Sequence, residues 1–423
     1  MRPIILIGIA AFTLAAQTQA PVPSAPDKVT LSQAVQEAID RNLGLLADRF
    51  NLTIADARII TARLRPNPVF SAGLDYQDIL GTGFNVQNAA GPAEFNVRID
   101  FLLERGQKRD HRIEVAQASR QVAELQLINT TRQLVLDVQN GFVDVLSAKD
   151  ALTLARENLK AFEGIVEVNA TRVRAGDLAQ VELVRSRVAA LQFQNAVRQA
   201  ESKLRVASNR LQSLLGRTTA SPTFDVEGTL RREIPALGIE ELQRQALELR
   251  PDLLALRREE ARSLADIRLQ QAQGKVDYTV GTEYHRQYDN GKGNAMGFFF
   301  SAPLPVFNKN QGEIERARRE QEQILMRIRA QQANIQTEVR NAWVQFTTSR
   351  DLLQSIETDL LGQAQEVRNT MEYSYRRGEA SLVEFLDAQR AFNDARQSYN
   401  DARADYARSL YLMDSISGKA VNP

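Results

Sequence analysis

The stretch "LRPNPVFSAGLDYQDI" (Leu64–Ile79) decides the fold, because two different patterns meet in it. The residues before it, from about 30 to 64, contain no proline and predict one long helix. Pro66 and Pro68 end that helix, since proline has no backbone N–H to donate. Apolar and polar side chains then alternate, which predicts a strand over about residues 69–78 with one apolar face.

The same order of helix and strand returns 208 residues later, in "GKVDYTVGTEYH" (Gly274–His285). Matching positions lie 208 residues apart as far as the first strand of each copy. They lie 201 residues apart at the start of the long helices and 202 residues apart at the tight turns. Such repetition predicts two copies of one structural unit. The matches include Leu45–Ala47 with Leu253–Ala255, Ile113 with Ile314, and Gly176 with Gly378.

The change in spacing falls in the loop between the two strands of each copy. This loop spans 80–94 in the first copy and a shorter 286–295 in the second, and both are rich in Gly and Asn. Each copy therefore reads as helix, strand, loop, strand, long helix, tight turn and returning helix. The predicted divisions are a signal peptide at 1–20, a first repeat at 21–216, a linker at 217–237, a second repeat at 238–418 and a tail at 419–423. The predicted strands are at about 69–78, 95–103, 276–285 and 295–302.

The N-terminal residues 1–20 have the pattern of a secretory signal peptide. Arg2 precedes an apolar run from Ile4 to Ala16, and small residues precede a plausible cleavage site after Ala20. That run is shorter than the roughly 20 residues a membrane-spanning helix needs, so we expect export rather than anchoring. No cysteine follows, so we expect the exported protein not to be lipidated.

Composition excludes several functional classes. The 53 basic and 52 acidic residues nearly cancel, which argues against a nucleic-acid partner. The absence of cysteine excludes disulfides, zinc–thiolate sites and thiol catalysis, and two histidines leave little for imidazole metal chemistry. No phosphate loop or HExxH motif occurs, so we predict no enzyme activity, no cofactor and no metal site.

The long helices are predicted to pack as antiparallel coiled coils. Residues 106–173 contain no proline and would extend about 100 Å as a helix. Gly176 and Gly378 then predict reversals, because glycine ends helices readily. The returning helices carry seven-residue repeats, which predict a left-handed supercoil. These rows are Phe385, Phe392, Tyr399, Tyr406 and Met413 in one helix, and Leu183, Ala190, Val197, Leu204 and Leu211 in the other.

The four strands present the remaining problem. Strands of about ten residues with one apolar face are typical of membrane β-barrels, although their period alone equally fits a half-buried sheet in a soluble protein. Four strands cannot close a barrel, and an open sheet edge cannot lie in lipid. We therefore expect several copies to share one barrel, from which the helices extend as a second, α-helical cylinder. The predicted fold class is mainly α with membrane β and a tandem repeat.

Four short strings give the chain a resemblance to the TolC family of outer-membrane efflux channels, over nearly its whole mature length. Two of them most resemble the CzcC-like cobalt–zinc–cadmium branch, whose channels serve heavy-metal pumps: "LLERGQKR" (102–109) and "PLPVFNKNQGEI" (303–314). The others are "LRPNP" (64–68) and "RPDLLALR" (250–257).

The resemblance implies a homotrimer with a 12-stranded barrel and a periplasmic α-barrel. Such a channel is a passive duct that docks onto a periplasmic adaptor protein and an inner-membrane resistance-nodulation-division (RND) pump. Many members carry a lipidated N-terminal cysteine, which this chain lacks.

The resemblance also implies a periplasmic gate at the hairpin tips. The acids that narrow the entrance match Glu384 and Asp387, which are three residues apart and so share a helix face. Three copies would place six carboxylates around one axis, which would attract cations and raise the pKa values of the closest acids. An ordinary solvated helix face is the simpler alternative.

Contacts that hold such a gate closed would involve Tyr375, with Glu182 as its acidic partner. Arg185 is an alternative partner for the acids, and Tyr375 could equally serve packing alone. The hairpin tips are the expected contacts for the adaptor, through Arg174, Gly176, Asp177, Arg376, Gly378 and Glu379.

Two alternatives to a metal-efflux channel stay open. The same channel could export drugs, or secrete polypeptides in a type I system. A secreted coiled-coil scaffold or adhesin would account for the helices, but it leaves the strands without a purpose.

Overall fold

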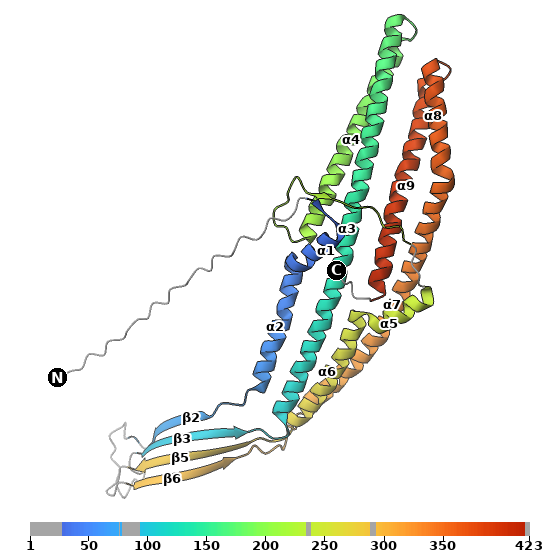
Figure 1. Cartoon of the computed structure of the whole chain (residues 1–423). Helices are drawn as coiled ribbons and strands as arrows, with labels where there is room; N and C mark the ends of the chain where they lie inside the picture. Colours follow the sequence, from blue (N-terminus) through green and yellow to red (C-terminus); the bar gives the residue numbers. More distant parts are fainter. Residues whose placement is uncertain (1–27, 76, 78–93, 234–237, 288–292, 419–423) are drawn as a thin grey trace, which may run out of the picture.

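The molecule is elongated, with a four-stranded sheet at one end and two helical hairpins reaching toward the other (Figure 1). The predicted signal peptide at 1–20, the tail at 419–423 and nearly all of the loop at 80–94 lie outside the described residues. The computed structural model describes residues 28–75, 77, 94–233, 238–287 and 293–418.

Both repeats follow the predicted order of elements. The first contains α1 (Leu31–Arg41), α2 (Leu43–Arg63), β2 (Val69–Asp75), β3 (Glu94–Leu103), α3 (Lys108–Ala175) and α4 (Gln180–Leu214). The second contains α5 (Ile239–Leu249), α6 (Pro251–Gln273), β5 (Tyr278–Gln287), β6 (Gly293–Ser301), α7 (Gln311–Ser355), the π-helical turn η1 (Ile356–Leu360), α8 (Leu361–Arg377) and α9 (Leu382–Ile416). β1 (Lys28–Val29), which precedes α1, pairs in parallel with β4 (Asp225–Val226) in the linker between the repeats.

The prediction of a single helix over 30–64 is wrong, because the helix breaks at Asn42. Asn42 has an extended backbone, and its side chain accepts a hydrogen bond from the N–H of Leu45 as the N-cap of α2. Its amide also donates to the carbonyl of Leu214 at the end of α4. The second repeat breaks in the same way at Arg250, between α5 and α6.

A glycine at the end of each returning helix packs against the break in its own repeat. Gly216 has a φ of 79°, and a Cβ added there would lie 2.2 Å from the carbonyl oxygen of Arg41. Gly418 has a φ of 73°, and its Cβ would lie 2.7 Å from the nitrogen of Arg250. Both positions require glycine for conformation and for space. We call these contacts the two glycine joints.

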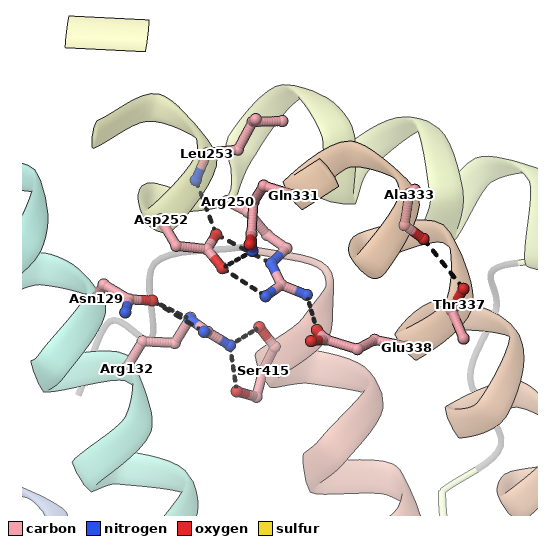
Figure 2. A network of polar contacts seen from close by, with 10 residues as sticks. All are labelled: Asn129, Arg132, Arg250, Asp252, Leu253, Gln331, Ala333, Thr337, Glu338 and Ser415. Atoms are coloured by element: carbon pink, nitrogen blue, oxygen red, sulfur yellow. Dashed lines mark hydrogen bonds and ion pairs between the residues drawn. The ribbon is translucent and has the colours of Figure 1, made fainter. Parts of the chain in front are cut away.

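A polar network surrounds the second joint (Figure 2). The buried guanidinium of Arg250 donates to Asp252, at 2.6 Å between Nη2 and Oδ2, and to Glu338 on α7. Burial by itself would raise the pKa of Asp252, but the hydrogen bonds from Arg250 outweigh it and hold that pKa below its usual value. Arg132 on α3 donates to the backbone and side-chain oxygens of Ser415, at 2.9 and 3.0 Å. Side chains from α3, α7 and α9 therefore meet at the start of α6.

The second outgoing helix contains a π-helical turn, which the first lacks. In the first repeat, α3 is a continuous helix of 68 residues, or about 100 Å. In the second, α7 and α8 are separated by the π-helical turn, where the N–H of Leu361 donates to the carbonyl of Ile356, five residues earlier. Such a turn takes up an additional residue in a helix. The repeat spacing increases from 201 to 202 residues along this helix, which matches one inserted residue.

The sheet joins the repeats, because β3 of the first pairs with β5 of the second in the order β2-β3-β5-β6. All neighbours are antiparallel, and β2 and β6 are the edges. The second strand is one residue longer than predicted, and β5 and β6 extend the hairpin into the expected loop at 286–295. β5 begins at Tyr278, two residues after the predicted start, because the carboxylate of Asp277 accepts hydrogen bonds from Arg105 and Lys108 at the start of α3.

None of the helices in the described ranges is long and apolar enough to cross a membrane.

Cross-strand pairing gives the sheet two distinct faces. One face carries Phe70, Ala72, Leu74, Phe95, Val97, Ile99, Phe101, Leu103, Tyr278, Val280, Thr282, Tyr284, Met296, Phe298 and Phe300. The other carries Ser71, Asp75, Asn96, Arg98, Asp100, Leu102, Thr279, Glu283, His285, Phe299 and Ser301.

The heptad prediction is confirmed by burial. Residues of both returning helices fill the helical cores, where two clusters lie around the glycine joints and a third lies near the hairpin tips. The buried members of the predicted rows in α4 and α9 are Leu183, Leu211, Phe385, Tyr406 and Met413.

Gly216→Ala and Gly418→Ala are each expected to destabilise the protein. The left-handed backbone alone costs about 1–2 kcal/mol for a residue with a Cβ, and the close backbone contacts add to this. Thermal unfolding of the purified protein in detergent, followed by circular dichroism, measures the effect. Gly164→Ala is the control, because its Cβ would meet nothing within 4 Å inside α3 and should raise stability by up to about 1 kcal/mol. Equal melting temperatures for all three variants would show that the two glycine joints do not require glycine.

Candidate functional site

The hairpin tips are built by two matching turns. At the first, Gly176 has a φ of 85° and the N–H of Asp177 donates to the carbonyl of Arg172 at 2.9 Å. At the second, Gly378 has a φ of 81° and the N–H of Glu379 donates to the carbonyl of Ser374 at 2.9 Å. Both are Schellman turns, so the predicted reversals are confirmed. The predicted adaptor contacts are all exposed: Arg174, Gly176, Asp177, Arg376, Gly378 and Glu379.

The helix after the second tip is the more firmly capped of the two. Ser381 and Glu384 form a capping box at the start of α9, in which each side chain bonds the other residue's backbone. α4 begins after Ala179 with no side-chain cap. The capping box therefore fixes the backbone geometry at the point where the second tip joins α9.

Glu384, one of the two predicted gate acids, is exposed but already has partners. Its carboxylate accepts hydrogen bonds from the backbone N–H and the hydroxyl of Ser381, at 2.7 and 2.8 Å. These bonds hold the pKa of Glu384 below its usual value. The capping contribution is thus complete at neutral pH and is lost as the pH falls through that lowered pKa. The rise in pKa expected from a ring of carboxylates acts in the opposite direction and requires other copies.

Asp387, the other predicted gate acid, lies one turn further along α9 and is also exposed. Its contact with Arg390 is long, at 3.4 Å between Oδ1 and Nη1. An exposed pair of this kind contributes little binding energy, so its charge is available to solutes.

Tyr375 makes a different contact from the one predicted. Its buried hydroxyl donates to Oδ1 of Asn169 on α3 at 2.8 Å, and its ring stacks on Phe385 with centroids 5.6 Å apart. Burial raises the pKa of Tyr375. Glu182 instead pairs with Arg185 along α4, at 2.8 Å. The expected pair of Tyr375 and Glu182 is therefore not formed within the described part of one chain.

Asn169 and Arg172 were not identified from the sequence, yet they connect the two hairpins. Asn169 is fully buried on α3, and Nη1 of Arg172 lies 3.4 Å from the carbonyl oxygen of Tyr375 on α8. Phe162 adds an apolar contact, since its ring stacks on Phe385 of α9 with centroids 6.1 Å apart. We call these residues, together with Tyr375, the hairpin clasp.

The clasp joins the two hairpins of one chain near their tips, and Glu384 and Asp387 of α9 are exposed. Among the described residues, no three His, Asp or Glu side chains converge in a way that could hold a metal ion. The geometry suits a surface that contacts solutes or other proteins.

Long antiparallel hairpins joined to a short, open sheet define the fold of an outer-membrane channel, and comparison with known proteins gives the family. The model of the family described as "Outer membrane efflux protein" matches residues 34–217 and 242–419. The chain belongs to this family, which consists of efflux ducts and not of enzymes. The secreted scaffold or adhesin is left without support.

Two curated relatives and one solved structure show the extent of the similarity. The cobalt-zinc-cadmium resistance protein CzcC of Cupriavidus metallidurans is 26% identical over 363 residues, covering 86% of this chain and 83% of that protein. The pyoverdine export outer membrane protein OpmQ of Pseudomonas putida is 24% identical over 396 residues, covering 85% and 80%. The crystal structure of the Campylobacter jejuni CmeC outer membrane channel superposes with a TM-score of 0.76 at 13% identity, covering 98% and 94% of the two chains.

Tyr375→Phe is expected to loosen the hairpin clasp. It leaves Oδ1 of the buried Asn169 without a donor, which costs about 1–3 kcal/mol. Amide hydrogen exchange across residues 160–185 and 370–390 measures the change as faster exchange near the tips. Tyr373→Phe is the control, because that ring is exposed on the same helix. Equal exchange in the two variants would show that the hydroxyl does not hold the hairpins together.

Proposed function

We propose that this outer membrane efflux protein is the passive, homotrimeric duct of a tripartite pump that exports heavy-metal cations such as cobalt, zinc, cadmium or copper. One observation carries the proposal: each chain has an amphipathic sheet of four strands, and the outer edges of its two edge strands are unpaired in the described structure. An open edge is not tolerated in lipid, so copies must complete one another. Three copies supply 12 strands, which lies within the range of known membrane barrels.

The export partners follow from the other end of the molecule. The tips expose both charges and backbone, and their turn geometry is held by the Schellman bonds at Gly176 and Gly378. We infer that these tips dock onto a periplasmic adaptor, which connects the duct to an inner-membrane RND pump. The duct needs no energy source of its own, because the pump supplies it.

The proposed cargo rests on the similarity to CzcC and on the exposed acids of α9. Glu384 and Asp387 would attract cations entering a trimer. The similarity to OpmQ, which is named for pyoverdine export, favours an organic cargo instead and keeps drug or siderophore export as the second candidate.

Deletion of the gene is expected to lower tolerance of the host to cobalt, zinc, cadmium or copper. Plasmid-borne wild-type protein should restore growth, because it returns an outer-membrane exit to the proposed pump. Minimal inhibitory concentrations of each metal, measured beside a drug panel, test the assignment. Unchanged metal tolerance with lower drug tolerance would replace the metal cargo by the organic one.

The double variant Glu384→Gln with Asp387→Asn is expected to change the conductance of the channel and to weaken its block by multivalent cations. Glutamine preserves the capping box with Ser381 while removing the charge. Single-channel currents in planar bilayers report the effect. Glu366→Gln, which neutralises an exposed acid in the middle of α8, is the matched control. Currents identical to wild type would remove the gate role from both acids.

A further inference from the structure

The segment that follows β6 exposes apolar side chains that nothing in the described structure covers. Phe307 is 91% exposed and Leu304 is 83% exposed, and Val306 between them is also exposed. Leu304 and Phe307, together with Leu102 and Thr279, border a cavity of about 670 Å³ at the base of the sheet. Side chains of this kind normally lie against a partner surface.

The first repeat shows what the equivalent segment does. The turn between β3 and α3 packs onto the start of β5: the N–H of Arg105 donates to Asp277 at 2.8 Å, and Lys108 pairs with the same carboxylate at 2.7 Å. The guanidinium of Arg105 also lies over the ring of Tyr278, 4.5 Å from its centroid. Polar contacts therefore seal the boundary between a first-repeat strand and a second-repeat strand inside one chain.

The repeat relation identifies the missing partner of the second turn. The left-handed N-caps of α3 and α7, Gln107 and Asn310, lie 203 residues apart. At that spacing Leu103, which pairs with Tyr278, corresponds to Val306. At 208 residues Tyr278 corresponds to Phe70. The start of β2 is therefore equivalent to the start of β5. It lies at one edge of the sheet, whereas residues 304–307 follow β6 at the other edge. The apolar side chains around the start of β2 are also uncovered, with Phe70 67% and Leu64 60% exposed.

We propose that residues 304–307 of one copy dock onto residues 64–70 of the next copy, where they form an apolar seal at the periplasmic base of the shared barrel. The inference rests on the proposed trimer, since only a second copy can bring the two edges of the sheet together.

Cysteine crosslinking tests the seal without background, because the chain contains no cysteine. Chains carrying Val306→Cys and chains carrying Phe70→Cys are coexpressed, and membranes are treated with a short bismaleimide. We expect covalent dimers on denaturing gels from the coexpressed chains and none from either variant alone. Placing both substitutions in one chain should give a ladder up to the trimer.

The matched control uses the equivalent pair inside one chain. Leu103→Cys with Tyr278→Cys should crosslink internally, which is detected by mass spectrometry, with no new species on the gel. If wild-type chains run as trimers on native gels and Val306 and Phe70 give no dimers, the seal is refuted while the shared barrel stands. If wild-type chains are monomeric in the membrane fraction, the seal and the proposed function fail together.

Discussion

The constraint on which the structure depends is that the outer edges of β2 and β6 lack hydrogen-bonding partners within the described part of one chain. Their backbone groups need partners, and the apolar face of the same sheet is exposed at Phe70, Phe298 and Phe300. Water satisfies the backbone but not this face, and lipid satisfies the face but not the backbone. Both demands are met at once only when the edges of several copies pair, which makes assembly a condition for membrane insertion.

The tandem repeat supplies the parts of this assembly twice, with local differences where the two copies do different work. Each joint brings a charged pair next to its glycine: Arg217 holds Glu37 through two bonds of 2.8 Å in the first, and Arg250 holds Asp252 in the second. The outgoing helix is continuous in the first repeat but carries the π-helical turn in the second. The π-helical turn therefore lies at the base of the second hairpin, which is the hairpin that carries the proposed gate acids Glu384 and Asp387.

The sequence predicted the strands, tip turns and heptads because each has a local signal: alternation, glycine or a seven-residue period. The break at Asn42 escaped prediction because it depends on packing against Gly216, which is distant in sequence. Asn169 escaped because a polar residue in a long helix normally faces solvent, whereas here Tyr375 from the other hairpin buries it. The π-helical turn does have a signal in the sequence. The spacing between the two repeats grows from 201 to 202 residues inside a proline-free helix, which requires an extra residue in the second copy.

The position of Glu384 in the capping box bears directly on the proposed gate. Crowding six carboxylates around one axis favours protonation, which would remove the charge that attracts cations. Glu384 starts from a lowered pKa, because Ser381 donates two hydrogen bonds to its carboxylate, and the helix N-terminus also favours a negative charge. In the proposed trimer these bonds would oppose protonation of Glu384, so that its three copies keep the entrance negatively charged.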